Sequence, residues 1–269
     1  MSERLRVERS GPGGVVARVT LARPEVHNAF DASLIADLAA VFGGLGREGP
    51  ATLRAVVLAG DGPTFCAGAD LAWMRAATQL DVEANEQDAM AMAELFDTID
   101  TCPVPVIARV QGAALGGGMG LCAVADLVIA ESGARFGFTE TRLGLLPATI
   151  APFVIAKIGE SNARALFPGG RRFDAMRAQR IGLVHEIVEG EAALDAAVDA
   201  TITDVLAAGP TAARAAKAIV REVRGLGHGA TKWHTARTIA RQRVSAEARE
   251  GFEAFEGKRR PAWAPDEDG

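Results

Sequence analysis

The sequence predicts an α/β fold with a parallel sheet, because short apolar runs alternate along the chain with segments of helical periodicity. The runs 55–59, 104–110 and 127–130 have the length and composition of strands that are buried on both faces. Helical segments lie between them, so we expect right-handed crossovers. With 269 residues, of which 49% are hydrophobic, the chain suffices for one large packed domain or two small ones.

The N-terminal part of the chain predicts a hairpin followed by a helix. Apolar residues alternate in 5–7 and 15–21 on either side of the Pro/Gly turn 11–14, which is typical of two antiparallel strands. Asp31 has the position of an N-cap, and apolar residues follow it at helical spacing. The glycine pair 43–44 then predicts the end of this helix.

A second helix and a glycine-rich segment follow the same logic further along the chain. Residues 92–99 carry an amphipathic helical pattern, which the Cys-Pro pair 102–103 is expected to end. The stretch 112–120 is rich in glycine, and residues 119–124 predict a helix after it. Trp73 and Met74 are expected to form a helix face over a pocket.

The C-terminal part of the chain has a different composition, in which alanine dominates. Helical spacing recurs in three segments, 192–206, 211–223 and 231–248, with breaks at Gly-Pro and Gly-Leu-Gly. We therefore predict an α/β core over 1–190 and a helical region over 191–269, packed on the core or on a neighbouring subunit. Residues 265–269 are expected to be frayed.

Charge and cysteine content restrict the function classes. The net charge is -5, from 29 basic and 34 acidic residues, which disfavours a nucleic-acid or anionic-membrane partner. The cysteines are Cys66, Cys102 and Cys122; no C-x-x-C pair occurs, and a sparse, odd count fits a reducing cytosol. No apolar h-region opens the chain, and no apolar run reaches the roughly 18 residues of a membrane span. A cytoplasmic protein is expected.

Several common catalytic motifs are missing from the sequence. There is no G-x-x-x-x-G-K-[ST], no G-x-S-x-G and no H-E-x-x-H, and the four histidines lack metal-ligand spacing. A loose G-x-G-x-x-A pattern from Gly118 to Ala123 is too weak to imply a nicotinamide. We therefore expect no metal and no bound cofactor, and we expect the cysteines to be buried packing residues.

Two small-residue segments, 65–71 and 112–120, each follow a predicted buried strand, where α/β sheets place their binding crevice. Small residues let a ligand approach backbone N–H groups, and Gly117 near a helix N-terminus would direct its N–H outward. Two N–H groups that converge on one carbonyl oxygen form an oxyanion hole. The competing interpretation is that both segments are ordinary tight turns with close helix packing.

The order of several motifs along nearly the whole chain resembles the crotonase superfamily, the enoyl-CoA hydratase/isomerase family. The resemblance rests on Arg23-Pro24, His27-Asn28-Ala29-Phe30, the 65–71 segment, Gly116-Gly117-Gly118 with Ala125-Asp126, Phe136-Gly137, Glu140, Leu143-Gly144, Pro147, Phe173-Asp174-Ala175 and Gly182-Leu183-Val184. It implies a β-β-α spiral core with a helical trimerisation region, assembled as a homotrimer or a dimer of trimers. The implied substrate is an acyl-CoA thioester, which itself carries the coenzyme A.

The resemblance also implies roles for individual residues. The N–H groups of Ala69 and Gly117 would hold the thioester oxygen, and Glu140 would be the acid/base. Coenzyme A would lie along Ala29, Ala67, Gly68, Ala69, Asp70, Leu71 and Gly117. Lys258 and Arg259 would meet its phosphates, if necessary in an adjacent subunit; the alternative for these two is a solvated basic face.

The sequence departs from the paired-carboxylate hydratases of this family at one position. Those enzymes use two glutamates, which correspond here to Gly120 and Glu140. A single base suits isomerisation, because it can move one proton between two carbons. The segments 68–74 and 140–153, however, resemble bacterial methylglutaconyl-CoA hydratases, a branch that tends to carry glycine at this position. Phe136, Phe138 and Leu143 would give Glu140 an apolar setting that raises its pKa; the alternative is a surface acid in a loop.

Four functions therefore stay open at this point. The first is hydration of a 2-enoyl-CoA, with a branched, methylglutaconyl-like acyl group as the implied substrate. The second is isomerisation of a 3-enoyl-CoA to a 2-enoyl-CoA. The others are non-catalytic: an RNA-binding crotonase-fold protein, which the charge disfavours, and a scaffold that binds acyl-CoA without turnover.

Overall fold

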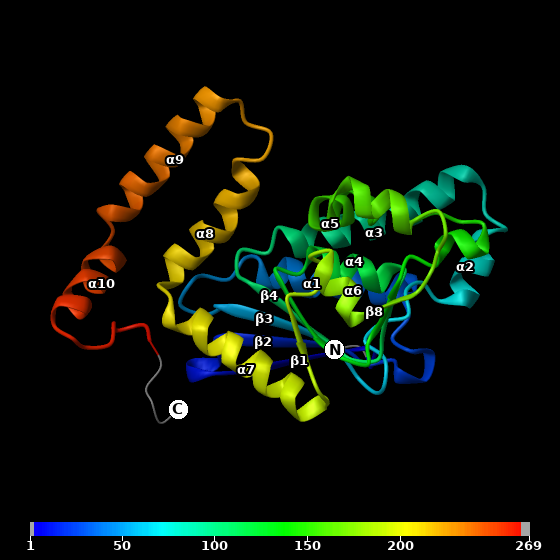
Figure 1. The fold of residues 1–269 in the computed structure, drawn as a ribbon, viewed down its shortest axis with the longest axis horizontal. Coiled ribbons are helices and arrows are strands. Elements are labelled where there is room, and N and C mark those ends of the chain that lie inside the picture. Colours follow the sequence, from blue (N-terminus) through cyan, green and yellow to red (C-terminus); the bar gives the residue numbers. More distant parts are fainter. Residues whose placement is uncertain (1–2, 265–269) are drawn as a thin grey trace.

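The computed structural model describes residues 3–264 and places them in two β-sheets flanked by helices (Figure 1). The larger sheet has the strand order β1-β2-β3-β4-β6-β9. Its strands are β1 Leu5–Ser10, β2 Val16–Leu21, β3 Ala55–Gly60, β4 Val106–Val110, β6 Leu127–Glu131 and β9 Glu186–Val188. The β1–β2 pair is antiparallel and every other pair is parallel, so both the predicted hairpin and the predicted parallel sheet are confirmed.

Both faces of the larger sheet are covered, because successive side chains of a strand point to opposite sides. In β3, Val56 and Leu58 belong to the larger apolar core, whereas Ala55 and Val57 belong to a smaller one. Helices α1 (Ala32–Leu45) and α3 (Val82–Asp100) fill the larger core, and α7 (Glu191–Ala207) closes the smaller. Because both faces of the central strands are buried, their sequences are continuous apolar runs.

The smaller sheet carries the segments that lead to the predicted site. It contains β5 (Ala113–Leu115), β7 (Arg135–Gly137) and β8 (Phe173–Asp174), in that order. Strand β5 lies inside the glycine-rich stretch, where no strand was predicted. Its residue Ala114 is fully buried and forms a parallel bridge with Cys66, so tertiary pairing and not local propensity makes this strand.

Several predicted helix limits are wrong, and packing explains the main one. Asp31 caps α1 as predicted, since its carboxylate accepts from the Leu34 N–H, but α1 continues through Gly43 and Gly44 to Leu45. Phe42 and Leu45 are buried in the core, and their burial outweighs the roughly 1 kcal/mol helix cost of each glycine.

The other limits differ by smaller amounts. Strand β4 starts at Val106, not at 104, and helix α4 (Gly117–Val124) begins earlier than predicted. The segment 231–248 is not one helix, because Ser245 caps a new one by accepting from the Ala248 N–H. The remaining helices are α2 Leu71–Ala77, α5 Ala151–Leu166, α6 Ala175–Arg180, α8 Pro210–Glu222, α9 His228–Arg243 and α10 Ala246–Glu256; short 3-10 turns cover Pro12–Gly14, Pro24–Val26 and Glu140–Leu143.

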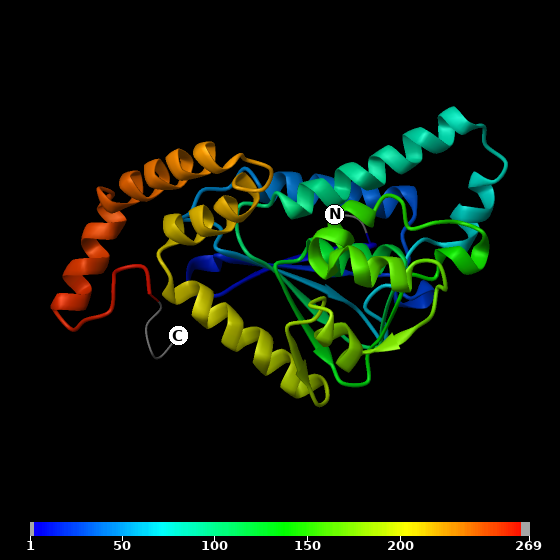
Figure 2. The same cartoon turned by 45° about the horizontal axis from the view of Figure 1, so that its top comes forward.

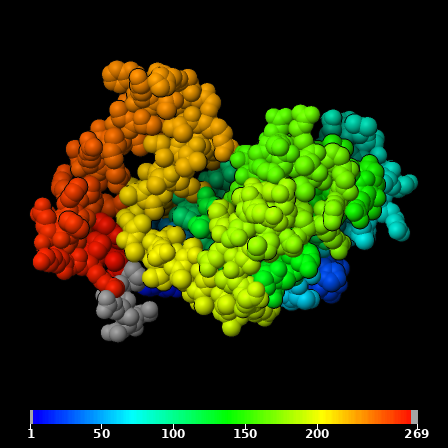
Figure 3. Space-filling view, viewed as in Figure 1, coloured from blue at the N-terminus to red at the C-terminus, as the bar shows by residue number. Residues whose placement is uncertain are grey.

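Helices α8, α9 and α10 form an arm that stands away from the sheet (Figures 1 and 2), and its α9–α10 part stands off from the core in the space-filling view (Figure 3). Neither α8 nor α9 has a fully buried residue. Arginines fix the base of the arm: Arg54 donates to the carbonyls of Leu206 at 3.0 Å and Trp263 at 2.8 Å, and Arg214 donates to that of Leu53 at 2.9 Å. The predicted helical C-terminal region is therefore confirmed.

Three further predictions concern the chain as a whole. Cys66, Cys102 and Cys122 are buried and form no disulfide, which confirms their assignment as buried packing residues. Over residues 3–264, no helix combines the length and apolarity needed to cross a membrane. The tail 265–269, predicted to be frayed, lies outside the described residues.

Candidate active site

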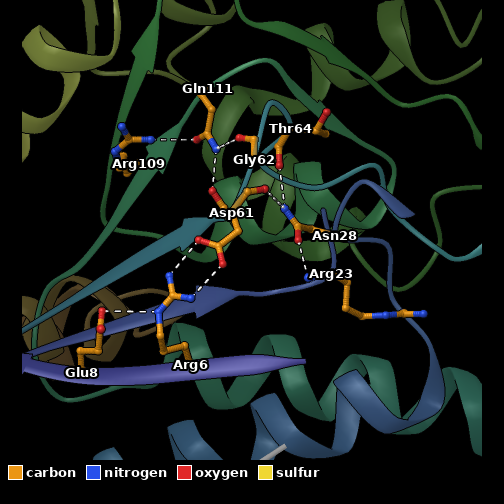
Figure 4. A network of polar contacts seen from close by, with 10 residues as sticks. Arg6, Glu8, Arg23, Asn28, Asp61, Gly62, Thr64, Arg109 and Gln111 are labelled. Atoms are coloured by element: carbon orange, nitrogen blue, oxygen red, sulfur yellow. Dashed lines mark hydrogen bonds and ion pairs between the residues drawn. The ribbon is translucent and has the colours of Figure 1, made fainter. Parts of the chain in front are cut away.

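Two buried side-chain amides fix the loop that follows β3 (Figure 4). The Asn28 side chain is wholly buried, and its Nδ2 donates to the carbonyls of Asp61 at 2.9 Å and Thr64 at 2.7 Å. The Gln111 Nε2 donates to the carbonyls of Gly60 at 2.6 Å and Gly62 at 2.9 Å. Each amide thus holds two carbonyl groups of the loop in place. Together they stabilise the conformation in which the loop leads toward residue 69.

A short parallel pairing then orients Ala69. The Phe30 N–H donates to the Gly68 carbonyl and the Asp70 N–H donates to the Phe30 carbonyl, each at 2.7 Å. This pairing uses the groups on either side of Ala69 and leaves its N–H without an acceptor among residues 3–264. Ala69 is half-buried and lines a cavity, so this N–H is available to a ligand there.

The Ala69 segment reaches the start of α4 only because residue 68 is glycine. A Cβ at Gly68 would lie 2.7 Å from the Leu115 carbonyl oxygen and 3.1 Å from the Gly117 nitrogen. Gly68 also has a φ of +91°, which other residues rarely adopt. The close approach brings the backbone of the first segment into contact with that of the second.

Gly117 is the first residue of α4, and its N–H likewise has no acceptor in the described part of the chain. The first N–H groups of a helix have no intrahelical partner and lie at the positive end of its dipole. A Cβ at Gly117 would lie 2.7 Å from the Phe30 ring. Phe30 therefore supports both N–H groups, one through its backbone and the other through its ring.

The carboxyl group of Glu140 lies next to this helix start. Its Oε1 is 3.4 Å from the place a Cβ of Gly116 would occupy. Its Oε2 is buried and has no hydrogen-bond partner among the described residues. Burial raises the pKa of Glu140, because removal from water disfavours the ionised form. A half-buried carboxyl with a free oxygen and a raised pKa is suited to proton transfer.

One cavity of about 910 Å³ joins these groups. Seven of the predicted site residues line it: Ala29, Ala67, Ala69, Asp70, Leu71, Gly117 and Glu140. Trp73 and Met74 also line it, as predicted. Gly68 is not a lining residue, but its lack of a side chain lets the Ala69 segment contact the start of α4. Lys258 follows α10 in the arm and is not among the lining residues; its delivery from a neighbouring subunit stays a prediction.

The family model for enoyl-CoA hydratase/isomerase matches residues 12–266. The chain belongs to this family. The enoyl-CoA hydratase AKT6-1 of Alternaria alternata is 35% identical over 207 residues, which cover 77% of this chain and 67% of that protein. Pseudomonas aeruginosa AtuE, of known structure, is 37% identical, with a TM-score of 0.93 over 98% of this chain and 100% of its own. An enoyl-CoA hydratase from Shewanella pealeana is also 37% identical, with a TM-score of 0.89 over 97% and 96%.

This enoyl-CoA hydratase/isomerase family member has the crotonase fold. At Gly120, where the resemblance implies the second glutamate of the paired-carboxylate hydratases, the structure packs apolar side chains closely against the backbone. A Cβ at Gly120 would lie 2.4 Å from Ile150 Cγ2 and 2.6 Å from Phe96 Cζ. The Phe96 ring in turn packs edge-on against Phe30, with centroids 6.3 Å apart. Glycine at 120 is therefore part of an apolar wall, and Glu140 is left without a carboxyl partner at that position.

The structure also shows contacts and lining residues of the site that the sequence did not indicate. Arg23 pairs with Asp31 at 3.0 Å and with Asp70 at 3.4 Å, while Asp70 caps α2 by accepting from the Ala72 N–H. This ion pair ties the Arg-Pro motif to the segment that carries Ala69; the motif was recognised, but its partners required the fold. Arg142 and Arg172 line the cavity as well, and no periodicity marked them.

Proposed function

We propose that this protein is an enoyl-CoA hydratase that adds water across the 2,3 double bond of a 2-enoyl-CoA thioester, with a branched, methylglutaconyl-like acyl group as the favoured class. One observation carries the proposal. Two backbone N–H groups, at Ala69 and Gly117, have no acceptor within residues 3–264, and they share a cavity with a buried carboxyl oxygen that also lacks a partner there. An acyl thioester would supply a carbonyl oxygen to accept from the two N–H groups, and carbon atoms that can exchange protons with the carboxyl group.

In the proposed mechanism, the two N–H groups hold the thioester oxygen while water attacks carbon 3. Negative charge develops on that oxygen as the enolate forms, and each donor of an oxyanion hole lowers such a barrier by about 3 kcal/mol. Helix α4 adds the positive end of its dipole at Gly117. Ordering of both N–H groups before substrate arrives means that little reorganisation is needed during the reaction.

Proton transfer in this mechanism falls to Glu140. The ionised carboxylate accepts a proton from the attacking water and returns a proton to carbon 2 of the enolate, which completes the addition. The wall of Phe96 and Ile150 beside Gly120 supports a one-carboxylate route, because Gly120 supplies no carboxyl and any side chain there would have to displace one of these neighbours. The hydratase name of the Alternaria relative and the resemblance of 140–153 to methylglutaconyl-CoA hydratases favour hydration.

The second candidate is isomerisation of a 3-enoyl-CoA into conjugation, and the lone carboxyl is the observation that favours it. Here Glu140 would remove a proton from carbon 2 and return it to carbon 4, while the same N–H groups stabilise the dienolate. No water is consumed. The two reactions therefore share every group of the site and differ only in whether a water molecule lies within reach of carbon 3.

A panel of straight, methyl-branched and 3-unsaturated CoA esters separates the candidates. Hydration removes the absorbance of the conjugated thioester and adds the mass of one water, whereas isomerisation creates the absorbance at constant mass. Glu140→Gln should abolish turnover and keep CoA-ester binding, since the amide cannot accept a proton. Turnover of no ester in the panel, or retained turnover in this variant, would contradict the proposal.

We also propose that the protein acts as a homotrimer or a dimer of trimers, with the arm as part of the contact. Trp233 and Phe255 on the arm are 78% and 83% exposed, and Phe252 and Val244 are also exposed. Large apolar groups gathered on one projecting element favour burial against another surface. In that assembly Lys258 would meet the CoA phosphates of a neighbour. A monomer at micromolar concentration in light scattering would contradict this assembly.

A further inference from the structure

The cavity wall contains two arginines whose guanidinium groups have no partner among the residues that the structure describes. Arg142 and Arg172 line the cavity, and in the described part of the chain neither guanidinium donates a hydrogen bond or lies within 4.0 Å of a carboxylate. Arg23, by comparison, is held by Asp31 and Asp70. Two unpaired guanidinium groups beside a largely apolar cavity leave up to ten N–H donors for whatever fills it.

The two arginines come from segments that pack against each other. Arg142 lies in the Glu140–Leu143 turn, two residues after the proposed catalytic carboxyl. Arg172 directly precedes β8, which pairs with β7. A Cβ at Gly137 would lie 3.3 Å from Arg172 Cγ, and one at Gly170 would lie 3.0 Å from Arg142 Cγ. The stems of both side chains are thus supported by backbone, while their head groups stay exposed.

Neither arginine serves as the ion-pair partner of Glu140. Burial is the main cause of the raised pKa of that carboxyl, and no nearby cation offsets it. A guanidinium in contact with the carboxylate would lower its pKa. The other acids of the cavity wall are Asp70, which pairs with Arg23 and caps α2, and Asp88 of α3, which forms no ion pair with either arginine. The two cations are therefore free for a ligand.

We infer that Arg142 and Arg172 bind a carboxylate at the far end of the acyl group, so the preferred substrates are enoyl-CoA esters that carry a second acid group. This inference rests on the proposed function, because it assumes that the thioester oxygen lies on Ala69 and Gly117. Carbons 2 and 3 then lie beside Glu140, and the acyl chain continues along the Glu140–Leu143 turn. Planar guanidinium groups match carboxylates with two parallel hydrogen bonds.

Coenzyme A phosphates are the other source of anionic oxygens in such a ligand. The proposed pantetheine path runs along Ala29 and the 67–71 segment, whereas both arginines belong to the segments around Glu140. A carboxylate on the acyl group meets them without any change in that path. The two sources make different predictions, because every CoA ester carries the phosphates and only some carry the acid.

The test compares two esters of equal chain length, glutaconyl-CoA with a terminal carboxylate and 2-pentenoyl-CoA with a methyl group, on the full-length protein. We expect kcat/KM to favour glutaconyl-CoA, and the ratio between the esters to fall on the order of tenfold or more in Arg142→Gln and in Arg172→Gln. Arg171→Gln is the matched control: Arg171 is exposed and does not line the cavity, so its loss should leave the ratio unchanged.

A binding measurement keeps this inference separate from the reaction type. Titration calorimetry with the unreactive glutaryl-CoA and pentanoyl-CoA should give the same order of affinity and the same loss in the two variants. Equal losses for both esters would assign the arginines to the CoA phosphates, and no loss for either would leave them as solvated surface groups; each result overturns the inference. A wild-type protein that binds glutaryl-CoA tightly but turns over neither enoyl ester would instead contradict the proposed function.

Discussion

Substitution of Gly120 by alanine tests the steric basis of the proposed single-carboxyl site. The added Cβ would lie 2.4 Å from Ile150 Cγ2 and 2.6 Å from Phe96 Cζ, well inside the contact distance of two carbons. Because both contacts are so short, the cost of overpacking should lie in the upper part of the usual range, at about 2–3 kcal/mol, and the better helix propensity of alanine returns about 1 kcal/mol. We expect a net loss of about 1–2 kcal/mol, which lowers Tm by roughly 5 °C in a chain of this size.

Helix α4 transmits this strain to the site, because Gly117 at its start carries one of the proposed oxyanion donors. Differential scanning calorimetry measures the stability, and kcat on a 2-enoyl-CoA measures the displacement of the donor. Gly44→Ala is the matched control: Gly44 lies within α1, and nothing is within 4 Å of its added Cβ. That variant should gain about 0.5–1 kcal/mol.

A double-mutant cycle identifies the neighbour that fills the space. Phe96→Leu shortens the ring that the new Cβ meets, so the double variant should be less destabilised than the sum of the two single changes. Gly120→Ala with an unchanged or higher Tm would refute the reasoning. So would a stable Gly120→Glu variant with increased activity, since position 120 would then accommodate a second carboxylate.

Three further predictions concern proton transfer, loop support and assembly. The proposed mechanism needs the ionised form of Glu140, so kcat should fall as pH falls through its raised pKa, above the ordinary 4.5. Glu140→Gln should lower kcat about 10²–10⁴-fold and, since it removes a buried charge, should not lower Tm at pH 7. Asn28→Ala removes three hydrogen bonds and places alanine at a φ of +57°, so calorimetry should show at least about 3 kcal/mol of destabilisation, and residual kcat should fall with the loop. Phe255→Asp should weaken self-association in light scattering and leave the α-helical circular dichroism unchanged; an intact trimer would remove this side chain from the contact.

Two kinds of element could be predicted from the sequence. They are helix ends fixed by a neighbouring capping residue, and strands that are apolar throughout because both of their faces are buried. The central strands were visible as apolar runs, and Asp31 marked a helix start through its capping chemistry. Strand β5 was not visible, because three residues show no period and pairing with β7 makes the strand. The glycine pair 43–44 wrongly predicted a helix end. The free energy gained by burying Phe42 and Leu45 depends on packing against α3 and the sheet, which the sequence does not show.

The residues of the candidate site could be named from the sequence, but the contacts that bring them together could not. Ala69, Gly117 and Glu140 could be named through resemblance, but their meeting on one cavity depends on the contact between Gly68 and the start of α4. The partners of Gly120 and the two free arginines come from segments far apart in the chain. Short patterns describe a residue's neighbours along the chain and contain no information on what packs against it.

The same packing connects the two halves of the proposed chemistry. Phe30 orients Ala69 through its backbone, supports Gly117 through its ring, and contacts Phe96, the ring that excludes a side chain from position 120. One aromatic pair thus supports both proposed oxyanion donors and occupies the space beside Gly120, which leaves Glu140 as the proposed proton-transfer group. A change at position 120 therefore acts on enolate stabilisation as well as on acid/base chemistry. A second carboxylate at position 120 would have to displace Ile150 or the Phe96 ring, so we expect its acquisition to need a compensating change at one of these residues.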